Sequence, residues 1–203
     1  MLDVDVTRPP TSFAGFQAAP TQCRRRTLRH AVETLVLVHP SIKRLADDDA
    51  LDELADDLMI GPDDFTTVKV DYSGRVIHLA CVCNSAWRGD RKGGFLELKA
   101  LAALAGHTVV LVPEAFIRRE PRLSNSLMIA GAAGAEIGLT DRMKILALLL
   151  DNGGSAPLLD LAAMVRGDEP VAAIMALVIE GGLYVDLNKR ILPSTEVHLV
   201  QPL

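Results

Sequence analysis

The chain has 203 residues, 49% apolar and 23% charged, so it is long enough for one large domain or two small ones with a substantial core. Its formal net charge of −5 excludes an overall attraction to nucleic acid, so any DNA-binding surface has to be local. The apolar runs are too short to span a membrane, and an odd number of cysteines, three, does not indicate a disulfide framework. No apolar signal segment follows the first methionine, and we expect a cytoplasmic protein.

The first half of the chain predicts an α/β fold. Residues 1–20 contain three prolines and little periodicity, which predicts a flexible arm. A helix is then expected from Thr21 to Pro40, and a shorter acidic helix over Asp47–Met59. Two alternating, β-branched runs, Thr66–Val70 and Arg75–Cys83, predict a hairpin because turn residues separate them.

A polar loop is expected next, and the pattern then becomes helical. The segment FLELKALAALAG predicts a helix that ends at Gly106, and HTVVLVP predicts a short buried strand. Phe116–Met128 is rich in arginine and is interpreted as a loop. The glycine-rich stretch AGAAGAEIG marks a domain boundary, so residues 21–130 form the first domain and residues 139–203 the second.

The second domain has the pattern of a winged helix. Three helices are expected, over residues 140–152, 158–165 and 168–180. Two strands, Leu183–Leu187 and Glu196–Val200, follow and are joined by a polar loop. Three helices followed by a two-stranded wing is the order of the winged helix-turn-helix.

The segment from Gly94 to Met128 resembles the TnsA-like endonucleases of the PD-(D/E)XK superfamily. The helix FLELKALAALAGH, the strand TVVLV and the segment IRREPRLSN carry the resemblance, together with the winged helix that follows. The resemblance extends over roughly residues 25–203, and it implies a restriction-endonuclease-like sheet with flanking helices.

The resemblance also implies a metal-dependent nuclease site, which the sequence lacks. The family holds its metal with an Asp on one strand and a Glu-x-Lys on the next. Alignment of the hairpin puts Glu-x-Lys at Cys81-Val82-Cys83 and the Asp near Thr67 and Val68, and none of these residues is acidic. The literal Glu97-Leu98-Lys99 lies in a helical segment, where residues two apart cannot converge on one ion. Cys81 and Cys83 are interpreted as buried thiols, since no fourth zinc ligand is visible beside them and His78.

Three arginine-rich clusters and the wing are candidate DNA-backbone contacts, because phosphate contacts supply most sequence-independent affinity. Solvated charge, offset by the acidic stretch Asp47–Asp57, is the alternative interpretation. The candidate residues are Arg24, Arg25, Arg26, Arg29, Arg88, Arg91, Lys92, Arg118, Arg119, Arg122, Lys189 and Arg190.

The third helix of the second domain is not expected to read bases. It carries Asp168 and Glu169 at its start and no basic residue. Ala172, Ala173 and Ala176 instead predict a flat surface for contact with another subunit or domain, and a homodimer is the commonest use of such a surface.

The sequence leaves three functions open. The leading hypothesis is a non-catalytic nuclease-fold protein that associates with DNA as an accessory or regulatory homo-oligomer, with no cofactor, no membrane and no small-molecule substrate. The second is an active endonuclease that uses Mg²⁺ or Mn²⁺ with relocated groups, namely Glu33, Asp71, Glu97 and Lys99. The third is a protein-interaction scaffold without DNA affinity.

Overall fold

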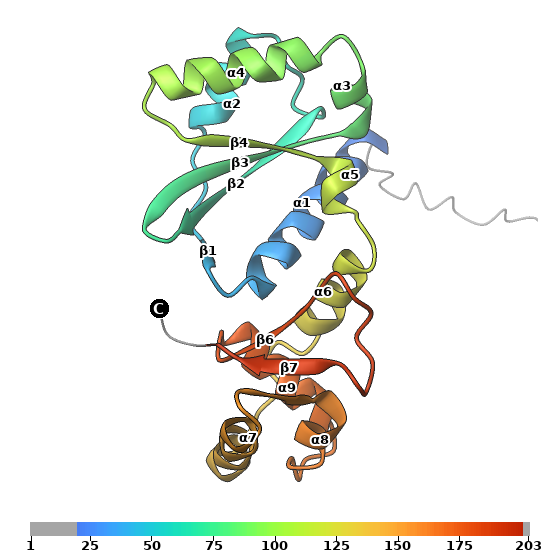
Figure 1. Ribbon diagram of the computed structural model, residues 1–203. Helices are drawn as coiled ribbons and strands as arrows, with labels where there is room; N and C mark the ends of the chain where they lie inside the picture. Colours follow the sequence, from blue (N-terminus) through green and yellow to red (C-terminus); the bar gives the residue numbers. More distant parts are fainter. Residues whose placement is uncertain (1–19, 201–203) are drawn as a thin grey trace, which may run out of the picture.

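The computed structural model describes the chain from Pro20 to Val200, and its side chains from Arg25 onward. The arm predicted for residues 1–20 lies outside the described residues, except that Pro20 begins the first helix. Figure 1 shows a sheet with helices on both faces and a smaller C-terminal unit beside it. Between residues 20 and 200, no helix combines the length and the apolar character that a membrane span requires.

A mixed four-stranded sheet forms the centre of the first part of the chain. Its strands are β1 (Ile42–Arg44), β2 (Phe65–Tyr72), β3 (Arg75–Val82) and β4 (Val109–Pro113). They lie in the order β1-β2-β3-β4, with the first three antiparallel and β4 parallel to β3. A parallel pair requires a crossover connection, which α4 (Lys92–Leu104) supplies. The predicted α/β class is therefore confirmed.

The hairpin of β2 and β3 forms where the sequence predicts it. Ser73 and Gly74 make the turn with φ angles of 53° and 78°, the left-handed backbone that tight hairpin turns need. The Gly74 amide donates a hydrogen bond of 2.8 Å to Asp71 Oδ1, which satisfies a turn donor. Phe65 pairs with Val82 and Tyr72 with Arg75, so the two strands are paired along their whole length.

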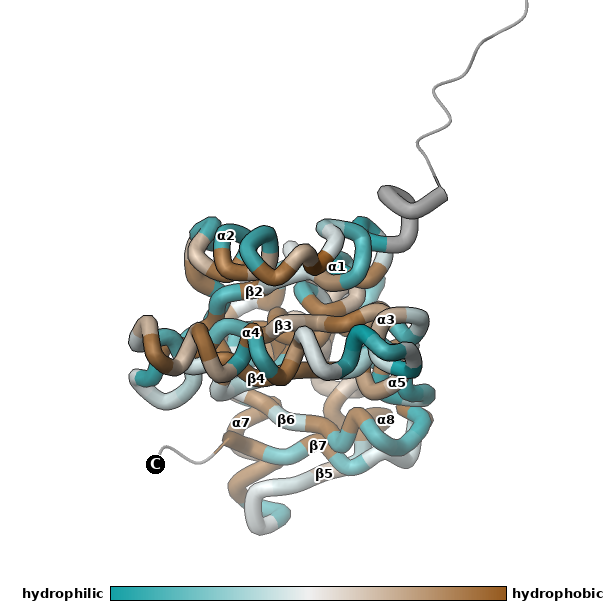
Figure 2. The backbone as a smooth tube through the Cα atoms, turned by 90° about the horizontal axis from the view of Figure 1, so that it is seen from above, coloured by the Kyte–Doolittle hydropathy of each residue, from teal (hydrophilic) through white to brown (hydrophobic). Residues whose placement is uncertain are grey.

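Helices cover both faces of the sheet. One face is covered by α2 (Ala50–Asp57), α3 (Asn84–Arg88) and α4. The other is covered by α1 (Pro20–Val38), α5 (Glu114–Ile117) and α6 (Arg122–Ala130). Alternate residues of β3 therefore enter opposite cores, Ala80 and Val82 on the α4 side and Cys81 on the α1 side. Figure 2 shows helices that alternate between apolar and polar residues, as one-sided burial requires.

Four elements of this part are absent from the sequence prediction: β1, α3, α5 and α6. The segment predicted as a loop over Phe116–Met128 in fact contains the end of α5 and most of α6. A helix of four or five residues completes about one turn, so hydrophobic periodicity does not reveal α3 or α5. In α6 the polar residues Asn125 and Ser126 occupy buried positions, which breaks the apolar pattern.

The C-terminal unit has three helices and a three-stranded antiparallel sheet of order β5-β7-β6. Its elements are α7 (Leu139–Asp151), β5 (Ser155–Pro157), α8 (Leu158–Ala162), α9 (Pro170–Ile179), β6 (Leu183–Val185) and β7 (Glu196–Leu199). The predicted helices and the two last strands are present. The strand β5 is an addition, too short to give an alternating pattern.

The two parts of the chain pack against each other. Val38 at the end of α1 and Ile129 of α6 belong to the same buried cluster as Ile145 and Ile174 of the C-terminal unit. Helix α6 contacts both α1 and α9. The glycine-rich segment 130–138 thus connects two parts that share a core, and α6 is the element between them.

Candidate nucleic-acid interface

Three helical segments meet at the edge of the sheet where β3 and β4 end. The amide of Asn84, which begins α3, donates a hydrogen bond of 3.0 Å to Glu114 Oε2 at the start of α5. Arg118 donates to Glu114 Oε1 at 2.7 Å and to Thr27 Oγ1 of α1 at 3.2 Å. These contacts fix α3, α5 and the first part of α1 beside one another, as Figure 1 shows.

The loop that follows β6 lies against α6 on the same side of the molecule. Asn125 of α6 is buried, and its Nδ2 donates to the carbonyl oxygens of Leu187 at 2.8 Å and Lys189 at 2.7 Å. These bonds satisfy two loop carbonyls from one amide group. They also hold Lys189 and Arg190 on the side where α5 and α6 lie (Figure 1).

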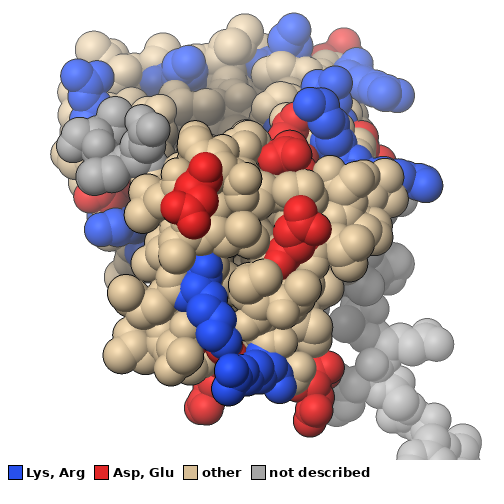
Figure 3. Space-filling model, turned by 60° about the horizontal axis from the view of Figure 1, so that its bottom comes forward, with Lys and Arg blue, Asp and Glu red and all other residues tan. Residues whose placement is uncertain are grey.

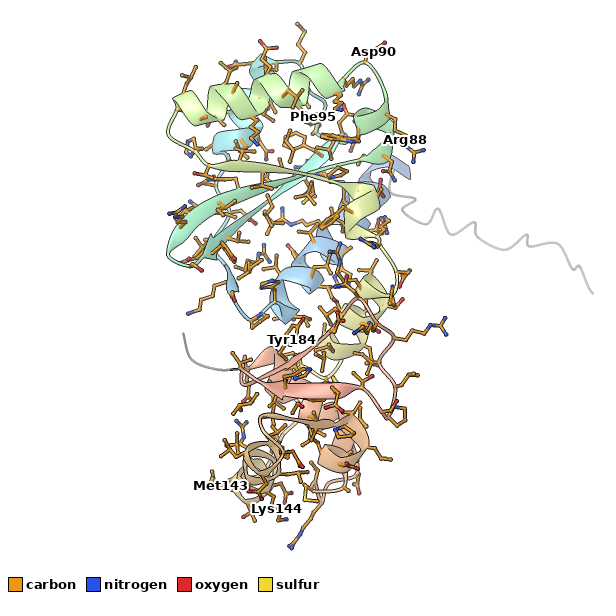
Figure 4. The ribbon with its side chains drawn as sticks, viewed as in Figure 1. Arg88, Asp90, Phe95, Met143, Lys144 and Tyr184 are labelled. Carbon is orange, nitrogen blue, oxygen red and sulfur yellow. The ribbon has the colours of Figure 1, made fainter. Side chains whose placement is uncertain are left out.

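Four exposed arginines lie on the elements that meet here: Arg26 of α1, Arg88 of α3, Arg119 between α5 and α6, and Arg190 of the loop. We call these four residues the basic edge. Among the described side chains, none of the four forms an ion pair, and Figure 4 shows Arg88 pointing away from the ribbon. Figure 3, a view of the end of the molecule formed by the C-terminal unit, shows basic and acidic side chains interspersed, so the positive charge is local. Segments far apart in sequence thus bring available positive charge to one side of the molecule.

Most of the other predicted basic residues are engaged inside the chain. Ion pairs join Arg25 to Asp52, Arg29 to Asp47, Arg91 to Asp64, Arg118 to Glu114, and Lys189 to Asp186. Lys92 Nζ lies 5.3 Å from the centroid of the Trp87 ring. The side chain of Arg24 lies outside the described residues. The acidic stretch Asp47–Asp57 therefore offsets part of the charge of α1, as one interpretation of the sequence expects.

Arg122 differs from the other arginines because it is only half exposed. Its guanidinium carbon lies 4.2 Å from the centroid of the Phe116 ring, and its Nη2 donates to the Phe116 carbonyl oxygen. Burial lowers the pKa of Arg122, and the charge of Arg119 lowers it further. This side chain faces the protein and does not belong to the basic edge.

The positions at which the resemblance implies a nuclease motif are buried in the apolar core. Cys81 and Val82 are fully buried and Cys83 is 7% exposed, while Thr66 of β2 is paired directly with Cys81. Burial raises the pKa of the Cys81 thiol to about 12, so it is not a thiolate at neutral pH. None of the side chains at these positions is acidic, and they contribute to packing.

Two carboxylates do lie near this edge, but arginines hold them. Asp64, just before β2, is paired with Arg91, and Glu114 is paired with Arg118 at 2.7 Å. Across the described part of the chain, no three His, Cys, Asp or Glu side chains are grouped so that they could hold a metal ion.

The relocated groups considered for an active nuclease are not brought together. Glu33 is on α1, where it accepts from Arg29 at 2.9 Å and pairs with Arg44 at 3.0 Å. Asp71 is at the hairpin end of β2, and alternation puts it on the face opposite α1. Glu97 and Lys99 are exposed on α4, which covers that opposite face. Glu33 and Glu97 are thus separated by the sheet.

The alanines of α9 do not form an open surface, and this expectation is corrected. Ala173 and Ala176 are 3% and 4% exposed, and every residue from Ala173 to Val178 is buried. Helix α9 packs against α1, α6, α8 and β6 of its own chain. Ala173 and Ala176 allow close packing within the molecule and are already covered, whereas Ala172 is partly buried.

A buried polar cluster on the α4 side of the sheet is not predicted by the sequence. His78 is 4% exposed, and its ring lies edge-to-face with His107, with centroids 5.2 Å apart. Its Nδ1 lies 3.8 Å from Asp48 Oδ1, and Asp48 Oδ2 accepts from Lys69 Nζ at 2.6 Å. Burial lowers the pKa of His78, although Asp48 acts in the opposite direction. The direct pairing of Lys69 with His78 across β2 and β3 is the signal that places them on one face.

No protein-family model matches this chain, and no curated protein matches it either. The contacts, burial and charges of the described residues are therefore the basis for a function.

Proposed function

We propose that this protein is a non-catalytic, nuclease-fold accessory or regulatory protein that holds duplex DNA through phosphate contacts along the basic edge. The observation that carries the proposal is that the start of α1, α3, the connection between α5 and α6, and the loop after β6 lie on one side of the molecule (Figure 1). Each of these segments carries an exposed arginine, namely Arg26, Arg88, Arg119 and Arg190. Phosphate contacts by arginine provide most sequence-independent affinity, and a local cluster provides them despite a net charge of −5.

The order of elements supports the resemblance to TnsA-like endonucleases. The hairpin, α4, β4 and the arginine-rich segment follow one another as the resemblance requires, and the sheet has helices on both faces. The order α7-β5-α8-α9-β6-β7 supports a winged helix in the C-terminal unit.

Two features favour binding without cleavage. The motif positions are Cys81 and Cys83 in the core, and the nearby Asp64 and Glu114 are held by arginines. Metal-dependent phosphodiester cleavage needs carboxylates that can coordinate a cation, and an arginine-paired carboxylate already has its charge compensated.

The burial of α9 favours contact with the DNA backbone over base readout. The helix that would enter the major groove in a winged helix has six consecutive buried residues and is covered by α6. We therefore expect affinity that depends little on sequence.

The test combines binding and cleavage in one sample. A fluorescent duplex and a supercoiled plasmid are titrated with the protein at low salt, with Mg²⁺, with Mn²⁺ and with chelator. The proposal expects saturable binding of the duplex in all three conditions and no nicking in any. Metal-dependent nicking that the Glu33→Gln variant abolishes favours the endonuclease. Absence of binding at low salt favours the interaction scaffold.

A further inference from the structure

An apolar hollow lies between the sheet and the C-terminal unit. Its volume is 230 Å³, and it is lined from α1, β3, β4, α5, α6 and the loop after β6. Its lining residues include Val36, Leu79, Val112, Phe116, Arg122 and Leu187.

Arg122 is the positively charged side chain among the residues that line this hollow. Its Nη2 donates to the Phe116 carbonyl oxygen and its guanidinium carbon lies 4.2 Å from the centroid of the Phe116 ring, so two contacts hold the group. Its Nε is buried and has no hydrogen-bond partner among the described residues. A buried N–H without a partner is costly, and the cost is greater for a charged group.

We propose that this hollow binds a medium-chain aliphatic carboxylate, with the chain among the apolar residues and the carboxylate on the guanidinium group of Arg122. The hollow is smaller than the sites of drug-sized ligands, which span about 300–1,000 Å³. A methylene group fills about the volume of one water molecule, roughly 30 Å³, so the hollow accommodates a chain of about eight carbons. A carboxylate oxygen that accepts from this guanidinium forms a charge-assisted hydrogen bond.

A second hollow gives the ligand a path and a place for its polar end. It has a volume of 280 Å³ and shares His39, Arg122 and Leu187 with the first. It is also lined by Tyr184, which is 43% exposed and which Figure 4 shows at the junction of the two parts. Arg122 thus lies where an apolar hollow meets one that reaches an exposed side chain, as an amphipathic ligand requires.

The surrounding groups favour binding over chemistry, and a carboxylate over a phosphate. Cys81 also lines the apolar hollow, but its raised pKa leaves it a neutral thiol. Arg122 is the only Lys or Arg among the residues lining either hollow, and its Nη2 is already used by Phe116. A single guanidinium matches the charge of one carboxylate, whereas a phosphate monoester carries about −2 near neutral pH.

Calorimetric titration of the full chain with octanoate and with octan-1-ol tests the site. The proposal expects one octanoate per chain, bound at least about tenfold more tightly than octanol. Arg122→Met keeps a linear apolar side chain without the charge, so it should remove the preference for octanoate and leave octanol binding within about twofold. Leu79→Phe should fill the hollow and weaken both ligands. Arg75→Met, which removes an exposed arginine at the start of β3, is the control and should bind like the wild type.

Several results would overturn the inference. They are the absence of saturable octanoate binding to wild type, equal affinity for octanoate and octanol, or an unchanged preference in Arg122→Met. Circular dichroism shows whether Arg122→Met is folded. If it is not, the comparison of the two ligands on wild type and on Leu79→Phe decides the question. DNA affinity is not involved, so failure here and failure of the proposed function are separate results.

Discussion

The basic edge makes a quantitative prediction about salt. Each phosphate contact contributes about 0.9 to the slope of log affinity against log salt. Four contacts, from Arg26, Arg88, Arg119 and Arg190, give a slope of about −3.6, which lowers the affinity about 150-fold between about 50 and 200 mM salt. The double variant Arg88→Gln, Arg119→Gln retains two contacts, so its slope falls to about −1.8 and its loss over the same interval to about 12-fold.

Fluorescence anisotropy on a duplex of mixed sequence measures both slopes. The matched control is Arg75→Gln, Lys99→Gln, which removes the same charge from two exposed side chains on the hairpin and on α4. Because these residues lie away from the basic edge, the control should keep the wild-type slope. A second duplex of different sequence should give the same affinity, since no base readout is expected.

Equal losses of affinity and slope in the control and in the double variant would contradict this prediction. In that case net charge would govern binding, and the placement of Arg88 and Arg119 would not matter. A wild-type slope close to zero would refute it equally, because it would mean that phosphates are not contacted.

Further predictions concern packing, the loop after β6 and pH. Leu98→Ala should lower the free energy of unfolding by about 2–5 kcal/mol because Leu98 is fully buried. Leu96→Ala, on the exposed side of α4, should change it by less than about 0.5 kcal/mol. Similar values for the two variants in urea denaturation would contradict the orientation of α4. Ala173→Glu should destabilise the fold by several kcal/mol because it puts a charge into the core. A stable variant with an altered mass in solution would instead indicate that Ala173 lies on an exposed interface. Asn125→Ala should speed amide exchange at residues 187–190 by freeing two carbonyls, while Ser124→Ala should not. The pKa of His78 is lowered in the folded chain, so the unfolded chain binds a proton at this residue more readily. The contribution of His78 to stability is therefore complete above pH 6.5 and is lost as the pH falls below that value. His78→Gln should flatten the dependence of the free energy of unfolding on pH, and an unchanged dependence would exclude His78 as its cause.

Much of the fold was predictable where hydrophobic patterns are long. Helix α1 before Pro40, the hairpin of β2 and β3, and the pair α4 and β4 each carry several periods of their pattern. The short elements were not predictable, because α3 and α5 have five and four residues and depend on contacts with the rest of the chain. The bond from the Asn84 amide to Glu114 joins residues thirty positions apart, and no local pattern contains it.

The residue types of the candidate site were predictable from the sequence, but the contacts of each arginine were not. The sequence identifies the arginine clusters, yet it does not tell which arginines are available. Arg91 is paired with Asp64 and Arg118 with Glu114, whereas Arg119 beside it remains exposed. These differences arise from tertiary contacts.

The alanines of α9 show the same limit. A helix with small residues and no basic side chain fits an external interface and a buried packing surface equally well. Packing of α9 against α6 and α1 makes Ala173 and Ala176 part of the core.

The central claim, that duplex DNA lies along the basic edge, is tested most directly by hydrogen exchange of the protein with and without a duplex. We expect DNA to slow exchange in α3, in residues 117–121 and in the loop that contains Arg190, and to leave α7 and the hairpin turn at Ser73 and Gly74 unchanged. Protection centred on α7 to α9, or no protection at a DNA concentration that saturates binding, would contradict it.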